Sequence, residues 1–341
     1  MTTQLDFQVG MAKESTYGTA VTVTRFPEAP AKAKYDVKTI KGKGLRPTKG
    51  VARTSRHAIV GFEGSGEIPI EAPTKGLGFL LNAVMGAVTN TVIGATAAYQ
   101  QNHTLSVTDP HPTYTVQEAL PFLGGGAVQP HTFVGCAFDS LEIAAKEGDF
   151  VQAKFAFMAQ KLRTDVAAAA ASYPTGDALL TFAHGAIGIA GTLTEPTTTA
   201  LASLSGTAAV NIADVSVSVK RNLDKKGMNL GGGGYRSRAP QLGRPEITGK
   251  ITAEYTDNTL RDAYLAQTSL PLVLTFTHDV EIATGIKPVL QIVLPAIRLK
   301  GEVPTSNDGE PITQSIDFEA FDNGTASQPI WIVYRTLDTT P

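Results

Sequence analysis

The chain has 341 residues, of which 42% are hydrophobic, 18% are charged and one is a cysteine, and its net charge is −2. This length can bury a substantial core in one large domain or two smaller ones, and the near-neutral charge argues against a general nucleic-acid-binding or membrane-surface protein. The single cysteine, Cys136, excludes an internal disulfide and a thiolate metal cluster, and we expect it to be a small core side chain. With no signal-peptide pattern and no long apolar run, we expect folding in a cytoplasm without membrane insertion.

The charged fraction is below the roughly 25% that is typical of soluble domains. A weakly charged surface is expected for a protein whose surface is largely covered by other copies of itself, although a weakly charged monomer would have the same composition. The charge is also uneven: residues 1–60 have a net charge of +7, and residues 301–341 have a net charge of −6. These two ends could pair between subunits and set their order, or each could be a solvated surface.

The first 60 residues predict an extended N-terminal arm followed by a basic loop. Residues 1–30 mix turn residues with one short β-prone stretch that ends at Pro27. Residues 38–57 are rich in Gly, Lys and Arg and contain Pro47, a composition that fits neither a helix nor a central strand. We therefore assign residues 1–60 to the arm and loop, and residues 61–341 to a β-rich domain.

This β-rich domain contains a strand–helix unit that occurs twice, at residues 61–90 and 246–270. In each copy a short strand with Gly, Ile and Glu in the same order precedes a short apolar helix, which we expect at residues 74–84 and 258–267. An internal duplication with no catalytic group at its matched positions favours a structural role.

Alternation of apolar and polar residues predicts several further strands. A tight polar turn at residues 146–149 joins two of them into a hairpin. The remaining chain contains an Ala/Thr-rich excursion at residues 163–208, with one strand near residues 179–182, and a glycine-rich loop at residues 224–245. The predicted strands cover residues 138–145, 150–158, 215–220, 270–278, 289–299, 312–321 and 330–334.

Motifs that carry chemistry are missing from the sequence. The glycines at residues 231–234 are followed by neither Lys-Ser/Thr nor a helix, so a nucleotide loop is excluded. No His-Glu-x-x-His and no Gly-x-Ser-x-Gly occurs. Glu71 and Glu254 occupy equivalent positions and could suggest a carboxylate pair, but an acid before a helix is explained by the helix N-terminus. We predict no enzyme, no cofactor and no metal site.

Four phrases resemble the tail tube (major tail) proteins of long non-contractile-tailed phages. They are Glu-Ser-Thr-Tyr-Gly-Thr-Ala at residues 14–20, Gly-Glu-Ile-Pro-Ile-Glu at 66–71, the Ser-rich strand at 215–220 and Gln-Ser-Ile-Asp-Phe-Glu-Ala-Phe at 314–321. They occur in the family's order over some 300 residues, whereas the excursion at 163–208 has no counterpart.

The resemblance implies a mainly β fold, a β-sandwich or half-barrel with one or two short flanking helices. It also implies rings, expected to be hexameric, that stack into a tail tube, with synthesis in the bacterial cytoplasm and final location in the virion. The implied partners are the subunit itself, the tape-measure, tail tip and tail terminator proteins, and genomic DNA that passes without specific binding.

Two other classes stay open at this point. Another β-rich virion protein, for decoration or head–tail joining, would form a single ring or bind a shell. A carbohydrate-binding β-sandwich or glycosidase would need an aromatic platform, yet Trp331 is the only Trp and lies in an apolar strand that predicts a core position.

For a tube, we expect acidic or neutral strands at residues 247–254 and 312–321 to line the lumen, because cations there would hold DNA. We expect the glycine-rich loop at residues 224–245 to become ordered through contact with a neighbouring subunit. The lumen-facing residues would be Glu254, Asp317 and Glu319. The contacts between rings or subunits would involve Lys41, Lys43, Arg46, Arg53, Arg56, Arg236, Arg238, Asp308 and Glu310.

Overall fold

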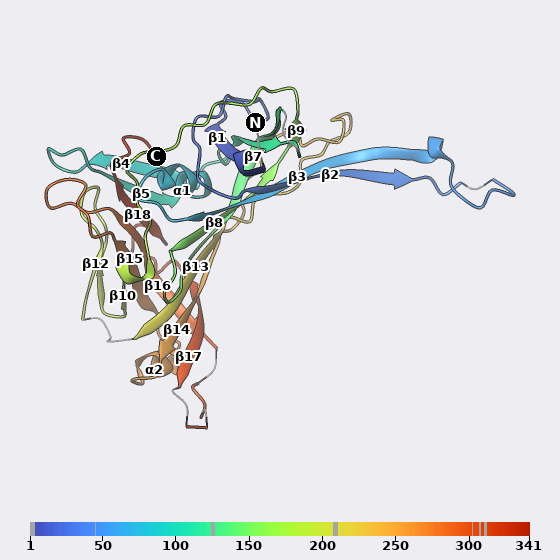
Figure 1. Cartoon of the computed structure of the whole chain (residues 1–341). Coiled ribbons are helices and arrows are strands. Elements are labelled where there is room, and N and C mark those ends of the chain that lie inside the picture. Colours follow the sequence, from blue (N-terminus) through green and yellow to red (C-terminus); the bar gives the residue numbers. More distant parts are fainter. Residues whose placement is uncertain are drawn as a thin grey trace.

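The computed structural model describes residues 4–44, 46–123, 127–206, 211–301, 303–306, 308–309 and 312–341. The fold is mainly β with two short α-helices, as the sequence predicts (Figure 1). The strands are β1 (Gln8–Lys13), β2 (Lys32–Lys41), β3 (His57–Glu71), β4 (Gly86–Val92), β5 (Tyr99–Leu105), β6 (Tyr114–Pro121), β7 (Val128–Ala145), β8 (Gln152–Ala159), β9 (Lys161–Arg163), β10 (Gly185–Ile189), β11 (Thr192–Thr194), β12 (Ser203–Ser205), β13 (Ile212–Lys220), β14 (Glu246–Glu254), β15 (Leu270–Thr277), β16 (Val289–Lys300), β17 (Thr313–Ala320) and β18 (Trp331–Thr336). The helices are α1 (Leu77–Met85) and α2 (Thr259–Ala266), with 3-10 turns η1 (Gln4–Asp6), η2 (Thr54–Arg56) and η3 (Phe182–His184).

One antiparallel sheet forms most of the molecule, in the order β2-β3-β8-β7-β13-β14-β17-β16-β18-β5-β4. Strand β7 is long enough to belong to two layers: its first half pairs with β6 and β9, and its second half pairs with β8 and β13. The two halves meet near Gly135, which has a left-handed φ of 62°. The sheet therefore bends back over a single interior, as a half-barrel requires.

At both places where the sequence predicts a strand–helix unit, a strand leads to a short helix. Strand β3 leads to α1, and β14 leads to α2. Helix α1 is buried on nearly every side, and Gly86 ends it in the left-handed conformation usual for a helix C-terminus. Helix α2 instead lies at the far end of the sheet (Figure 1) and buries only Leu260 and Ala263. The two copies thus share a local plan but have different environments.

The last strands are buried on both faces, which explains their continuous apolar sequence. In β16, Leu290 and Ile292 face the main core, whereas Val293 belongs to a second cluster with Trp331. That cluster is covered by residues 193–204 of the Ala/Thr-rich excursion. Trp331 is therefore a core side chain, as expected, and the excursion covers the outer face of the sheet.

Side-chain amides hold the excursion in place. Gln291 binds both the backbone N–H and the carbonyl of Ala202, at 2.9 and 3.1 Å, and Gln100 and Asn102 each donate to the carbonyl of Thr197 at 2.8 Å. The strand expected near residues 179–182 is present only as two isolated bridges, Leu179 to Pro73 and Thr181 to Phe150, and the regular strands of the excursion are β10, β11 and β12.

The N-terminal residues differ from the predicted arm. Strand β1 pairs with β6 and buries Val9 and Met11 in the core. Residues 38–41, expected to be loop, continue β2, which pairs with β3 along its whole length. Glycines and cations are typical of loops, but an edge strand tolerates both because only one side of its ladder is paired. The extended element is therefore the β2–β3 hairpin.

The opening phrase of the chain folds around Glu14. Its carboxylate accepts hydrogen bonds from the backbone N–H groups of Gly18 and Gly135, at 3.0 and 2.8 Å, and from the hydroxyls of Thr113 and Thr115, at 3.0 and 3.1 Å. Glu14 is 8% exposed. This side chain therefore joins the N-terminal segment to the bend of β7.

Burial of His103 predicts a loss of stability in acid. The imidazole lies in β5, is fully buried, and neither ring nitrogen has a hydrogen-bond partner among the described residues. Burial lowers its pKa from 6.5 to about 3, so the stability that the neutral ring confers is complete above pH 6.5 and is lost as pH falls toward 3. One such group changes the free energy of unfolding by at most about 1.4 kcal/mol per pH unit.

Urea unfolding of the wild type and of His103→Gln between pH 4 and pH 7 measures this contribution. We expect a smaller loss of stability in the variant, and equal losses would contradict the assignment. Glu118 acts with the opposite sign, since burial raises its carboxyl pKa from 4.5 to about 7 and its contribution is lost as pH rises through that range. Because the wild type and His103→Gln both contain Glu118, comparing their stabilities at the same pH cancels the Glu118 contribution.

Candidate functional site

The solvent side of β3, β8, β7, β13, β14, β17 and β16 forms a continuous surface, here called the polar sheet face. Directly opposite residues on neighbouring strands align in rows across it, and all are exposed or half-buried. One row contains Lys154, Glu142, Ser218, Thr248, Glu319 and Arg298; the next contains Gln152, Ala144, Ser216, Lys250, Asp317 and Lys300. The opposite side of the same strands faces the core, with residues such as Ile251 and Phe318.

Opposite charges meet along these rows. Lys154 lies opposite Glu142, Lys220 opposite Glu246, Lys250 opposite Asp317, Arg298 opposite Glu319 and Lys300 opposite Asp317. Lys154 also forms an ion pair with Glu67 at 2.9 Å, and Lys300 forms one with Glu319. Each Lys or Arg within these seven strands therefore has a carboxylate directly across from it.

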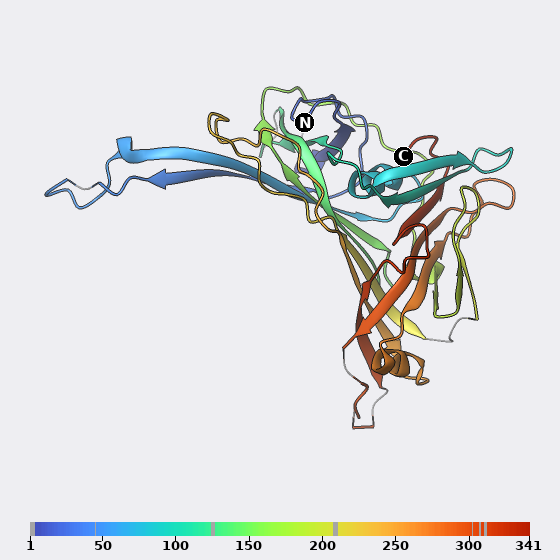
Figure 2. The ribbon, with the colours of Figure 1, turned by 180° about the vertical axis from the view of Figure 1, so that it is seen from behind.

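The β2–β3 hairpin projects far from the body of the molecule, as both views show (Figure 1 and Figure 2). Between residues 37 and 62 the sequence has seven Lys or Arg residues and no acid, and one of the seven, Lys38, forms an ion pair with Glu63 at the base of the hairpin. Apolar side chains are also exposed there, with Val51 71%, Ile59 57% and Ile40 56% accessible. A strand pair with uncovered apolar residues and one sign of charge has the character of a contact surface.

The glycine-rich loop at residues 224–245 packs against the base of this hairpin. The carbonyl of Gly234 accepts the N–H of Phe62 at 3.0 Å, and the rings of Tyr35, Phe62 and Tyr235 stack with centroid separations of 5.9 and 4.5 Å. A Cβ on Gly234 would lie 3.0 Å from Gly61, so glycine permits this approach.

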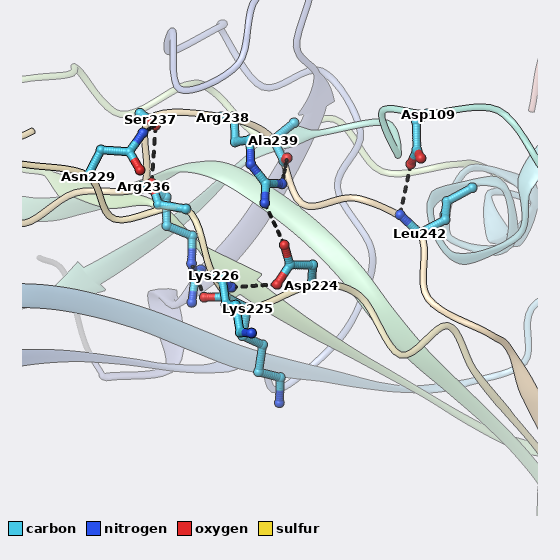
Figure 3. A network of polar contacts seen from close by, with 11 residues as sticks. Asp109, Asp224, Lys225, Lys226, Asn229, Arg236, Ser237, Arg238, Ala239 and Leu242 are labelled. Carbon is cyan, nitrogen blue, oxygen red and sulfur yellow. Dashed lines mark hydrogen bonds and ion pairs between the residues drawn. The ribbon is translucent and has the colours of Figure 1, made fainter.

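The loop's own polar contacts hold it to the subunit (Figure 3). Arg238 forms an ion pair with Asp224 at 2.6 Å, and Arg236 donates to the carbonyl of Lys225 at 3.1 Å. At the loop's other end, Leu242 donates its N–H to Asp109 at 2.8 Å. The loop, which we expected to order against a neighbour, is thus held by its own subunit.

The predicted contact residues fall into distinct places. Lys41, Lys43, Arg46 and Arg56 are exposed on the hairpin, and Arg53 is half-buried there. Arg236 is 5% exposed and directed into its own subunit, and Arg238 is half-buried in its ion pair. Asp308 is exposed in the turn after β16, and Glu310 lies outside the described residues.

The three residues expected to face the lumen, Glu254, Asp317 and Glu319, all lie on the polar sheet face. Sequence reasoning missed Glu142 and Glu246, which lie directly opposite Lys154 and Lys220 on the neighbouring strands. Their signal was alternation within a strand, but the opposing residue depends on strand order and register, which the sequence does not display.

A cavity of about 410 Å³ lies between residues 24–28, the start of α1 and residues 172–179. Two of its polar side chains are engaged within the chain: Lys75 donates to the carbonyl of Thr175 at 2.7 Å, and Asp338 accepts from the N–H of Gly76 at 2.6 Å. Among the described residues there is no group of three His, Cys, Asp or Glu side chains that could hold a metal ion. Burial also raises the pKa of the Cys136 thiol.

In the part of the chain that the structure describes, no helix has the length and apolarity to cross a membrane.

The fold and its two large surfaces define a structural β-protein whose distinctive parts are the polar sheet face and the projecting β2–β3 hairpin. The chain belongs to the phage tail tube protein family, whose family model matches residues 6–320. A comparison with curated protein sequences gave no match. The resemblance seen in the sequence is thus confirmed, and the protein is a structural component of the virion tail.

Proposed function

We propose that copies of this chain close into rings, six to a ring, and that the rings stack into the tube that conducts DNA during delivery. The projecting hairpin supports this most directly, because its apolar and basic residues have no cover within the subunit. A contact that repeats from one copy to the next without closing on itself builds a filament.

Two further features support ring closure and conduction. Strands β2 and β4 end the sheet order, and among the described strands each pairs with one neighbour only, so their free edges are available to adjacent subunits. The polar sheet face, with Glu254, Asp317 and Glu319, would line the lumen. The cations of the hairpin would lie between rings, away from passing DNA.

The partners in this proposal are other copies of the chain, the tape-measure protein that sets tube length, and the tail tip and tail terminator proteins at the two ends. Genomic DNA would pass through without specific binding. The subunit would be made in the cytoplasm of the host bacterium before it enters the virion.

Negative-stain electron microscopy of the purified chain over rising concentration tests the proposal. We expect hollow tubes or stacked rings of uniform diameter, because one repeated contact gives one geometry. If none form, co-expression with the other tail proteins of the same phage supplies nucleation. Dispersed subunits under both conditions would contradict tube assembly.

A further inference from the structure

We propose that the cavity beside α1 is a socket for the hairpin tip of another copy of this chain. The tip socket is bordered by residues 24–28 and 172–179, and the hairpin tip consists of residues 46–55. In the contact, Val51 enters the apolar interior of the socket. The inference rests on the proposed function, in which copies join through the hairpin, and it names the surface that receives the hairpin.

The socket and the hairpin lie at opposite ends of β3. His57 begins this strand within the hairpin, and Ile70, next to its last residue, lines the socket. At about 3.3 Å per residue, the strand separates these two residues by roughly 43 Å. The hairpin also projects away from α1 (Figure 1). A hairpin tip therefore cannot reach the socket of its own subunit, and the contact joins two copies head to tail.

The interior of the socket is apolar and already formed in the single subunit. Its lining includes Phe26 and Phe79, and its volume of about 410 Å³ is in the range usual for ligand pockets. The rings of Phe26 and Tyr173 join the two borders, with centroids 6.3 Å apart, and the N–H of Thr74 donates to the carbonyl of Ala178 at 2.8 Å. Tyr173 is still 40% exposed. A pocket that is fixed before binding loses little conformational entropy when it is filled.

Each border of the socket carries an exposed acid. Glu28 lies on one border and Asp177 on the other, and neither forms an ion pair within the part of the chain that the structure describes. The two cations of the lining, Arg25 and Lys75, donate to oxygen atoms of their own subunit at 2.6 and 2.7 Å. The socket therefore presents negative charge that its own subunit leaves unpaired.

The hairpin tip has the complementary pattern. Val51 is 71% exposed, and Lys49 and Arg53 lie two residues before and after it. Among the described residues neither cation has a carboxylate partner. One apolar side chain between two cations matches an apolar interior between two acids. Complementary charge of this kind selects the partner and fixes the register of the contact.

One border of the socket gives the Ala/Thr-rich excursion a second role. Residues 172–179 belong to this excursion, which has no counterpart in the phrases shared with tail tube proteins. Residues 193–204 of the same excursion cover the outer face of the sheet. The excursion therefore both covers the sheet and completes the surface that receives the hairpin tip.

Disulfide cross-linking of the full chain tests the contact. The variant with Val51→Cys and Tyr173→Cys has one thiol at the tip and one at the socket, while the native Cys136 is fully buried. With diamide as the oxidant, a head-to-tail contact should give a ladder of trimers and larger multimers on a non-reducing gel. Either single variant can form dimers at most. Val51→Cys combined with Glu147→Cys, at an exposed turn position, is the control for random collision.

Charge reversal gives a second measurement. Lys49→Glu with Arg53→Glu should raise the concentration needed for assembly by at least about tenfold, because acids would then face acids. Adding Glu28→Lys and Asp177→Lys should return that concentration to within about threefold of the wild type. Thermal melting checks that all variants are folded. A ladder no stronger than that of the Glu147→Cys control would overturn the proposal, as would a charge reversal that the added lysines do not correct.

The cross-linking result is separable from tube formation. If microscopy shows tubes but the ladder stays at the control level, the socket is disproved and the proposed function stands. If the ladder forms but no tubes appear under either condition, the contact between tip and socket is established and the tube assignment fails.

Discussion

Replacing Glu14 by alanine should lower the free energy of unfolding by about 3–5 kcal/mol. The substitution leaves two backbone N–H groups, those of Gly18 and Gly135, without their acceptor in a buried site. It also removes the partner of the Thr113 and Thr115 hydroxyls. Hydrogen bonds to an ionised carboxylate are about twice as strong as neutral ones, so losing four together is costly.

Urea unfolding monitored by circular dichroism measures the effect. Glu147→Ala, at an exposed turn position, removes the same charge and should change stability by less than about 0.5 kcal/mol. Glu14→Gln should fall between the two, since its amide keeps one acceptor but turns a donor toward other donors. A Glu14→Ala protein as stable as the Glu147→Ala control would contradict the role assigned to this carboxylate.

Shortening the hairpin should abolish tube formation while leaving the subunit folded. If residues 43–55 are replaced by Asn-Gly, β2 and β3 are joined by a two-residue turn just beyond the contact between the Gly42 N–H and the Arg56 carbonyl. The described residues removed include no buried side chain, so the melting temperature should stay within about 2 °C. The tip of the surface that we propose to reach the next ring would be lost, with Val51 and four of its cations, whereas Ile40 and Ile59 would remain.

Sedimentation and negative-stain microscopy at concentrations where the wild type assembles give the readout, and we expect subunits or single rings only. A matched control changes six of the seven cations to Gln and so keeps the length of the hairpin while removing most of its charge. The six are Lys41, Lys43, Arg46, Lys49, Arg53 and Arg56. Assembly by that control but not by the shortened chain would assign the contact to the reach of the hairpin tip rather than to its charge. Tubes formed by the shortened chain at wild-type concentrations would contradict the hairpin's role.

Where local patterning decided the structure, the sequence predicted it well. The strand–helix units, the hairpin of β7 and β8, and strands β13 to β18 follow from periodicity and from turn residues at their ends. The family was evident from short phrases in a fixed order, and the most informative of them, residues 14–20, contains the Glu14 anchor. Its role depends on Thr113, Thr115 and Gly135, which are about 100 residues away.

Strand β5 was missed for a different reason from β2. In β5 the stretch Gln100, Gln101, Asn102 and His103 reads as polar surface, yet all four are buried. Gln100 and Asn102 donate to carbonyls of the excursion, so their polarity is satisfied by a segment far along the chain. A pattern based on solvent exposure cannot detect a strand whose polar residues meet backbone groups.

The sequence by itself determined the mainly β class, the two places where a strand leads to a helix, the family and the separation of basic and acidic ends, because these depend on composition, periodicity and local order. Only the tertiary structure decided which strands are neighbours. Register then placed Glu142 opposite Lys154 and Asp317 between Lys250 and Lys300. The tertiary structure also showed that the basic segment is a projecting strand pair, and that residues 193–204 cover a second hydrophobic cluster. These features arise from non-local pairing, in which a shift of one residue reverses the face of every side chain.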